Sequence, residues 1–235
     1  MHPFFNIYQV ELSSYCNMRC SYCPHPSMER PKGYMTAEVL DRCIELHIEK
    51  GRRRMVLHHF GEPLLHPAFE DRLQRIASAG LAIQLSSNAL LLEKMWPVIL
   101  KIPARIRIMI SVHQWVAKGE EKYMHDIGTW KDRARGTNVE IMDAYNFKEG
   151  HFVFHAWGDG QKKEWDTSKC PFIEQNFGVI LWNGDIASCC VDHEGYTVRG
   201  NIMDEGPIRY RTEPWKACAT CDVGRIMIGE DFEKM

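Results

Sequence analysis

Short runs of β-branched and other apolar residues alternate with segments of helical periodicity from residue 7 to about residue 155. This alternation is typical of repeated βα units around a parallel sheet. The pattern therefore predicts an α/β fold with six strands in this part of the chain. The expected strands are Ile7–Leu12, Arg54–His58, Ala82–Ser86, Arg105–Ser111, Val139–Met142 and Phe152–Phe154.

The intervening segments carry helix signals. Thr36 is a suitable N-cap for a helix whose apolar stripe includes Cys43, so that this cysteine is explained as a core residue. Pro67 at a helix start and Gly80 at its end delimit the next helix. Two further helices are expected near Leu90–Ile102, which contains Pro97, and near Glu120–Ala134, which contains Gly128.

The character of the chain changes after Gly158. Residues 159–169 are charged and polar, and the segment that follows has cysteines and turn signals but little helical periodicity. Asn183-Gly184 between two apolar runs is a strong β-hairpin signal. We therefore divide the chain into residues 1–159 and residues 160–235, with a cysteine-rich region containing a β-hairpin in the second part.

Charge and hydropathy exclude several classes of protein. The 29 Lys and Arg residues nearly balance the 31 Asp and Glu residues, which leaves a formal charge of −2 and gives no support for nucleic-acid binding. No apolar run is long enough to span a membrane, and the first residues lack the basic and apolar regions of a signal peptide. We expect a cytoplasmic protein that binds neither nucleic acid nor membrane.

Nine cysteines are more than core packing requires in a cytoplasmic chain. Cys16, Cys20 and Cys23 lie within eight residues, directly after the first expected strand. Three thiolates at this spacing suit an iron–sulfur cluster that keeps one iron without a protein ligand. A closed zinc site completed by His25 is the alternative.

The motif C-x3-C-x2-C with Tyr22 before its third cysteine resembles the signature of the radical S-adenosylmethionine (SAM) superfamily. Gly61-Glu62-Pro63, after the second expected strand, resembles the family motif whose backbone binds the methionine amino group of SAM. The resemblance implies a partial (β/α)6 TIM-like barrel. It also implies a 4Fe-4S cluster held by the three cysteines, with SAM bound at the open iron and cleaved after one-electron reduction.

By the same resemblance, the polar residues at the ends of the third and fourth strands are candidates for SAM binding. These residues are Ser87, Asn88 and Ser111. Ser-Asn pairs also occur in ordinary turns, and that alternative stays open for Ser87 and Asn88.

If the reaction is the oxidation of an alcohol, hydrogen abstraction leaves a substrate radical that must still lose a proton and an electron. A base near the hydroxyl group would take the proton. The candidates at strand ends are His113, Asp143 and His155, with Asp159 and Asp192 behind them. Each of them could instead be a polar loop residue.

A second cysteine set lies after residue 160. Cys170, Cys189, Cys218 and Cys221 can close a tetrahedral site, and Cys189 is preferred to the adjacent Cys190 because of the spacing Gly184-x4-Cys189. The set resembles the twitch domain, a short form of the SPASM extension that carries an auxiliary 4Fe-4S cluster. A structural zinc site is the alternative. Size and motif order resemble the small radical SAM dehydrogenases that oxidise an aminocyclitol such as 2-deoxy-scyllo-inosamine.

The sequence thus predicts a radical SAM oxidoreductase that acts on a small polar molecule, such as a sugar or cyclitol. Its expected partners are this small-molecule substrate and a reducing electron donor such as flavodoxin or ferredoxin. Epimerase or peptide-modifying activity is the alternative within the family. A noncatalytic interaction module with two zinc sites is the alternative from another class.

Overall fold

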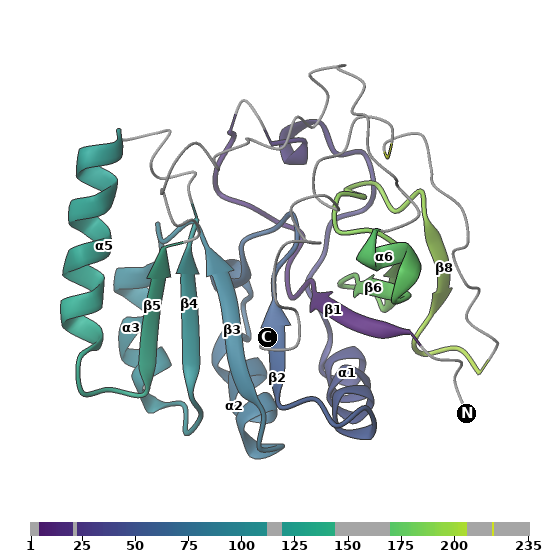
Figure 1. Ribbon diagram of the computed structural model, residues 1–235, viewed down its shortest axis with the longest axis horizontal. Helices are drawn as coiled ribbons and strands as arrows, with labels where there is room; N and C mark the ends of the chain where they lie inside the picture. The colour runs from purple at the N-terminus through teal and green to yellow at the C-terminus, as the bar shows by residue number, and fades with distance from the viewer. Residues whose placement is uncertain (1–4, 21–22, 112–118, 144–169, 206–217, 219–235) are drawn as a thin grey trace.

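The computed structural model describes residues 5–20, 23–111, 119–143, 170–205 and 218. Its centre is an eight-stranded sheet with the order β5-β4-β3-β2-β1-β6-β7-β8 (Figure 1). The strands are β1 (Asn6–Val10), β2 (Arg54–Leu57), β3 (Ala82–Ser87), β4 (Ile106–Ile110), β5 (Val139–Asp143), β6 (Phe177–Ile180), β7 (Asp185–Ala187) and β8 (Val198–Asn201).

Neighbouring strands from β1 to β5 are all parallel. Their carboxyl ends therefore meet at one edge of the sheet, which is the upper edge in Figure 1. The predicted α/β fold with a mostly parallel sheet is confirmed, and five of the six expected strands are present with small differences at their ends. The sixth, Phe152–Phe154, lies outside the described residues.

Most helices cover one face of this sheet, and the short helix Pro171–Glu174 packs against β6 on the other face (Figure 1). Alternate strand residues such as Ile83 and Leu85 of β3 and Ile106 and Ile108 of β4 are buried in one core, because successive side chains point to opposite faces. The helices are α1 (Ala37–Glu49), α2 (Phe69–Ser78), α3 (Leu92–Lys101), α5 (Glu120–Ala134) and α6 (Pro171–Glu174), with short 3-10 turns η1 (His25–Ser27) and η2 (Pro63–Leu65).

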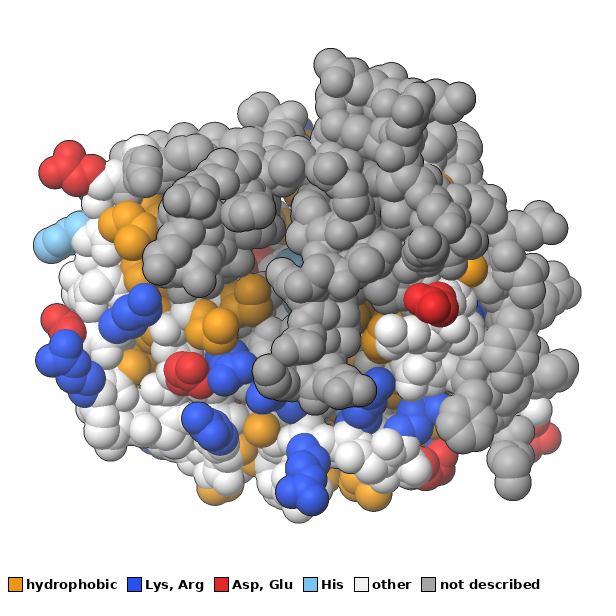
Figure 2. All heavy atoms as spheres, in the orientation of Figure 1, with side chains coloured by type: hydrophobic (Ala, Val, Ile, Leu, Met, Phe, Trp, Pro, Cys, Tyr) orange, Lys and Arg blue, Asp and Glu red, His pale blue; other side chains and the backbone are white. Residues whose placement is uncertain are grey.

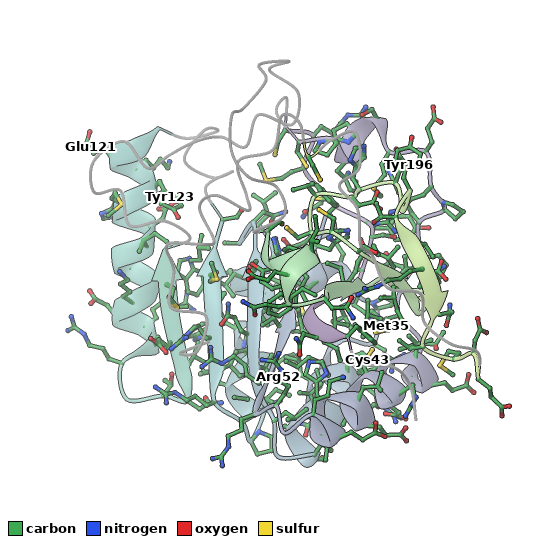
Figure 3. The ribbon with its side chains drawn as sticks, turned by 45° about the vertical axis from the view of Figure 1, so that its right-hand side comes forward. Met35, Cys43, Arg52, Glu121, Tyr123 and Tyr196 are labelled. Carbon is green, nitrogen blue, oxygen red and sulfur yellow. The ribbon has the colours of Figure 1, made fainter. Side chains whose placement is uncertain are left out.

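The local helix signals were informative. The hydroxyl group of Thr36 accepts a hydrogen bond from the Val39 N–H and caps α1 as expected. Cys43, which belongs to α1, is fully buried in the core and is labelled in the lower part of the molecule in Figure 3. Pro97 lies inside α3 without ending it. Trp96 and Ile99, on either side of this proline, are buried.

Residues beyond 170 extend the same sheet. β6 and β7 form the predicted antiparallel hairpin, and Gly184 in its turn has a φ of 91°, which favours glycine. β6 also runs parallel to β1, with Asn6 opposite Phe177. The described part of the second predicted region is therefore joined edge to edge to the first strand of the chain, while the boundary near residue 160 stays a prediction.

The amino ends of the strands form a basic edge. Lys and Arg side chains are spread over the lower half of the surface shown in Figure 2. Arg107 forms an ion pair of 2.9 Å with Glu140, and Arg54 donates to the Gln84 side chain at 3.2 Å. Because these contacts lie at the end of the sheet opposite the loops that carry the cysteines, we assign them to stability. Within the described helices, none has the length and apolar character to cross a bilayer.

Candidate active site

The three amino-terminal cysteines lie in the loop that follows β1, at the carboxyl edge of the sheet. Cys16, Cys20 and Cys23 are each partly exposed. The Cys23 N–H donates to the Cys20 carbonyl at 3.1 Å, and the Met18 N–H points to the Cys16 sulfur at 3.5 Å. Figure 3 shows sulfur atoms gathered near this upper edge, away from Cys43. Tyr22 lies outside the described residues.

Burial sets the acidity of these thiols. Loss of hydration raises the pKa of Cys16, and it raises the pKa of Cys23 to about 11. Backbone N–H groups of Met18 and His25 oppose these shifts, while the neighbouring Cys20 thiolate adds to them. The free thiols of Cys16 and Cys23 are therefore protonated at neutral pH, and binding of iron to their sulfur atoms would release these protons.

His25 does not complete a tetrahedral set around the thiols. Its Nε2 atom lies 2.9 Å from the Ser14 carbonyl oxygen, and its side chain is buried in that contact. Across the described ranges, no three His, Cys, Asp or Glu side chains converge as they would around a single metal ion. A cubane cluster holds its thiolates farther apart than one ion does, so three partly separated thiols on one loop are a donor set that suits a cluster.

The Gly61-Glu62 motif packs directly against this loop. A Cβ atom at Gly61 would lie 1.7 Å from the Ser13 carbonyl oxygen, so only glycine allows this approach. The Glu62 N–H donates to the Tyr15 carbonyl at 2.7 Å, one residue before Cys16. The two motifs that the sequence singled out are therefore fastened to each other through their backbones.

The Glu62 carboxylate connects the β2 and β3 ends. It accepts hydrogen bonds from the Leu64 N–H at 3.0 Å, the Ser87 hydroxyl at 2.9 Å and the Asn88 N–H at 2.7 Å. Burial raises the pKa of Glu62 to about 7, although these three donors act in the opposite direction. The Glu62 side chain thus lies inside the protein, and its hydrogen bonds order the loop that follows β2.

Ser87 and Asn88 are engaged within the protein. The Ser87 hydroxyl donates to Glu62 and accepts from the Ala89 N–H at 2.9 Å. The Asn88 amide donates to the Asn17 side chain at 2.8 Å and points to the Cys16 sulfur at 3.8 Å. Both residues are thus part of the network that supports the cysteine loop, and their predicted contact with SAM stays a prediction.

Ser111 follows β4 on the same edge. Its N–H donates to the Ser87 carbonyl at 2.8 Å, and its hydroxyl oxygen is buried without a hydrogen-bond partner among the described residues.

The structure describes only some of the residues that the sequence suggested as the catalytic base. Asp143 ends β5 at the carboxyl edge, and its side chain is outside the described part. His113, His155 and Asp159 lie outside the described residues altogether. The buried Asp192 carboxylate accepts four hydrogen bonds from residues 195–197, namely from three backbone N–H groups and the Thr197 hydroxyl. Asp192 therefore closes a turn, and this arrangement does not favour it as a base.

Three of the four expected auxiliary ligands are described. Cys170 precedes α6, Cys189 follows β7 and is buried, and Cys218 is buried as well. Cys170 and Cys190 pack against the same apolar cluster, which is formed by Phe172, Phe177, Val179, Leu181 and Ala187. Cys221 lies outside the described residues, so the auxiliary ligand set stays a prediction.

Sequence reasoning missed His59, which connects strand β1 to the segment that follows β7. His59, buried and with a pKa lowered to about 3 by burial, lies between Gln9 of β1 and the Asp192 carbonyl. Because the Gln9 amide donates to its Nδ1 atom at 3.2 Å, the Nε2 proton is directed to Asp192 at 3.3 Å. Its position before Phe60-Gly61 was the only signal in the sequence.

A parallel α/β sheet whose first loop carries C-x3-C-x2-C, held against a Gly-Glu-Pro loop, defines a class of cofactor-dependent enzymes. Residues 10–160 match the sequence profile of the Radical SAM superfamily. The match covers more than half of the chain, and the chain belongs to this superfamily. Membership implies a 4Fe-4S cluster and SAM, and the thiols on one loop together with the glycine that permits close packing fit these groups.

Two curated relatives show moderate similarity. The tungsten-containing aldehyde ferredoxin oxidoreductase cofactor-modifying protein of Pyrococcus furiosus is 29% identical over 216 residues, which cover 82% of this chain and 59% of the relative. The GTP 3',8-cyclase of Aquifex aeolicus is 29% identical over 125 residues, which cover 51% of this chain and 38% of the cyclase. The chain therefore spans less than two thirds of the length of either relative.

Solved structures share the fold. The structure of BtrN in complex with AdoMet and 2-DOIA has a TM-score of 0.62 at 22% identity, with 86% of this chain and 80% of BtrN covered. BtrN in an open conformation has a TM-score of 0.53 at 20% identity, with coverage of 86% and 77%. The predicted partial-barrel type of fold is thereby confirmed.

Proposed function

We propose that this protein cleaves SAM reductively and oxidises a secondary alcohol of a small polar substrate, such as a sugar or cyclitol. The observation that carries the proposal is the 2.7 Å hydrogen bond from the Glu62 N–H to the Tyr15 carbonyl, which joins the Gly-Glu-Pro loop to the cysteine loop. This contact brings a cluster-binding motif and a SAM-binding motif into one site.

Each part of the site has a role in the proposal. Cys16, Cys20 and Cys23 would hold the cluster, and the backbone at Gly61 and Glu62 would bind the amino group of SAM. Ser111 offers its hydroxyl group, which has no partner among the described residues, to the cofactor. We assign the Glu62 carboxylate to ordering the loop, because it is buried and accepts hydrogen bonds from three donors of the protein.

When bound, the cluster and SAM would supply the radical chemistry that removes one hydrogen atom from a substrate carbon. The protein positions that C–H bond and excludes water. Oxidation of the alcohol further requires the loss of one proton and one electron from the substrate. We assign proton removal to a residue among His113, Asp143 and His155, and electron acceptance to an auxiliary 4Fe-4S cluster on Cys170, Cys189, Cys218 and Cys221.

The substrate class has two supports. Size and motif order resemble the aminocyclitol dehydrogenases, and the structure most similar in fold among those compared above contains 2-DOIA. The first electron needed for SAM cleavage would come from an external reductant such as flavodoxin or ferredoxin. Epimerase and peptide-modifying activities are the competing outcomes of the experiments below.

The first experiment tests SAM cleavage. Anaerobically reconstituted protein with dithionite is expected to release 5'-deoxyadenosine, which is quantified by mass spectrometry. Cys20→Ala is expected to abolish the release, because the cluster loses a ligand. Cys43→Ala is the matched control, since Cys43 is fully buried in α1 and belongs to the core. Equal cleavage by Cys20→Ala and wild type would reject the assigned site.

The second experiment tests the substrate. Cyclitols and amino sugars that carry deuterium at the carbinol carbon are expected to transfer it to 5'-deoxyadenosine and to yield a ketone. Cys218→Ala is expected to retain some SAM cleavage but to form less ketone. Deuterium transfer without ketone formation would indicate an epimerase, and transfer only from labelled peptides would indicate a peptide-modifying enzyme.

A further inference from the structure

We infer that Asn88 is a positioning residue that donates a hydrogen bond to the Cys16 sulfur and raises the reduction potential of the cluster. The inference rests on the proposed function, in which Cys16 is a cluster ligand. It gives Asn88 a different role from direct SAM binding, which the sequence alone had suggested.

The orientation of the Asn88 amide is fixed by its own turn. The side-chain oxygen accepts a hydrogen bond from the Leu90 N–H at 3.0 Å. The Asn88 N–H donates to the buried Glu62 carboxylate at 2.7 Å. Because the oxygen is held by a backbone donor, the NH2 group must face the other way, toward the cysteine loop.

The NH2 group has two hydrogens and two acceptors in the cysteine loop. One is the Asn17 side-chain oxygen at 2.8 Å, and the other is the Cys16 sulfur at 3.8 Å. The whole residue is only 4% exposed, so water competes little for these contacts. Asn17 thus holds the Asn88 amide in place, and the second hydrogen of the Asn88 NH2 group faces the Cys16 sulfur.

A hydrogen bond to a cysteine ligand stabilises negative charge on the sulfur. The reduced form of the cluster carries one more electron than the oxidised form, so the bond favours reduction. Removal of the donor should therefore shift the midpoint potential of the cluster to a more negative value.

Asn88→Ser is the variant that removes this donor, together with the hydrogen bond to Asn17. A serine hydroxyl can still accept from the Leu90 N–H, but it is too short to reach Cys16. Asn88→Asp is the second variant; it keeps the length and the turn and removes the NH2 donor, but its negative charge also disfavours reduction, so the inference is judged on Asn88→Ser. Asn138→Ser is the matched control: its amide donates to the Ile102 and Ala104 carbonyls, which lie at the opposite end of the sheet.

The measurements are iron content and an anaerobic redox titration followed by electron paramagnetic resonance, on the reconstituted protein without SAM. Both Asn88 variants are expected to have a more negative midpoint potential than wild type, and Asn138→Ser the wild-type potential. An unchanged or more positive potential in Asn88→Ser, at full iron content, would overturn the inference.

The thermal unfolding temperature of each variant is measured as well, because iron can be lost either locally or through a general loss of stability. Iron loss from Asn88→Ser at an unfolding temperature no lower than that of Asn138→Ser would support a specific role in holding the cysteine loop. Iron loss that follows a general loss of stability in all three variants would overturn it. If wild-type protein holds no reducible cluster, the proposed function itself fails, and this outcome is distinguishable from unshifted potentials.

Discussion

Arg30 and Glu11 form a bidentate ion pair inside the protein, with N–O distances of 2.5 and 3.0 Å. Their side chains are 7% and 0% exposed. Arg30 follows the cysteine loop, and Glu11 follows β1. The same pair reaches the hairpin region, since Arg30 also donates to the His193 carbonyl and Glu11 accepts from the Trp182 N–H at 3.3 Å.

Replacement of Arg30 by methionine should destabilise the protein strongly. The change removes one partner of a buried pair and leaves the Glu11 carboxylate without its cation, at a cost of about 3–5 kcal/mol. We expect this decrease in the free energy of unfolding in urea. We also expect weaker iron retention, because the segment after Cys23 loses its anchor.

Arg42→Met is the control for the loss of a guanidinium group. Arg42 pairs with Glu45 at 2.9 Å on the surface of α1, where the Glu45 side chain is 62% exposed. Exposed pairs contribute about 0–1 kcal/mol, so the expected change is small. Similar destabilisation by both substitutions would contradict a special role for the buried pair.

Gly61→Ala should separate the two motif loops. The added Cβ would meet the Ser13 carbonyl at 1.7 Å, so the backbone must move. We expect at least a tenfold loss of SAM affinity in isothermal titration of the reconstituted protein, which corresponds to about 1.4 kcal/mol of binding free energy.

Gly128→Ala in α5 is the control. The added Cβ atom meets nothing within 4 Å, so this variant should keep its SAM affinity while the helix is stabilised by up to about 1 kcal/mol. Unchanged affinity in Gly61→Ala would contradict the packing argument.

His47 should make the protein sensitive to acid. Its Nδ1 atom lies 2.7 Å from the Cys43 carbonyl, and burial lowers its pKa from 6.5 to about 4. Between these two values the unfolded chain binds a proton that the native state does not bind. The free energy of unfolding therefore falls as the pH decreases from 6.5 to 4, by on the order of 3 kcal/mol for this group.

The contribution of His47 can be isolated with His47→Gln. The variant should lose part of this pH dependence, with a slope smaller by up to about 1.4 kcal/mol per pH unit in urea titrations between pH 4 and 6.5. His59, also buried and with a pKa of about 3, keeps a similar dependence in the variant. Parallel stability curves for wild type and variant would show that His47 is not buried in its neutral form.

Metal content separates the possible uses of the second cysteine set. Two four-iron clusters predict about eight irons and a similar amount of sulfide per chain. Cys218→Ala should reduce this to about four irons, because the loop cluster stays bound. Zinc in wild-type protein together with about four irons would favour a structural zinc site at the auxiliary cysteines.

Local signals accounted for much of the fold. Thr36 caps α1, and Asn183-Gly184 forms the hairpin turn, because each depends on residues that are neighbours in sequence. The candidate site was predictable where its residues lie close together in the sequence at a characteristic spacing, as Cys16, Cys20 and Cys23 do. Such spacing works because three ligands on one loop need no distant partner.

Contacts between distant segments could not be predicted in this way. Glu11 and Arg30 look like ordinary surface charges in sequence, and nothing in the sequence marks Phe177 as the neighbour of Asn6 in the sheet. The predicted contact of Ser87 and Asn88 with SAM stays a prediction, and their hydrogen bonds to Glu62 depend on two loops that the sheet brings together. Both cases depend on tertiary structure rather than on local preference.

The place of β6 beside β1 has a consequence for biosynthesis. β1 leaves the ribosome roughly 170 residues before the strand that completes its pairing, which at about 5–20 residues per second is on the order of ten to thirty seconds. During this interval the edge of β1 that pairs with β6 has no partner strand in the chain made so far. Delivery of iron and sulfide after release from the ribosome, rather than during translation, would suit this order of assembly.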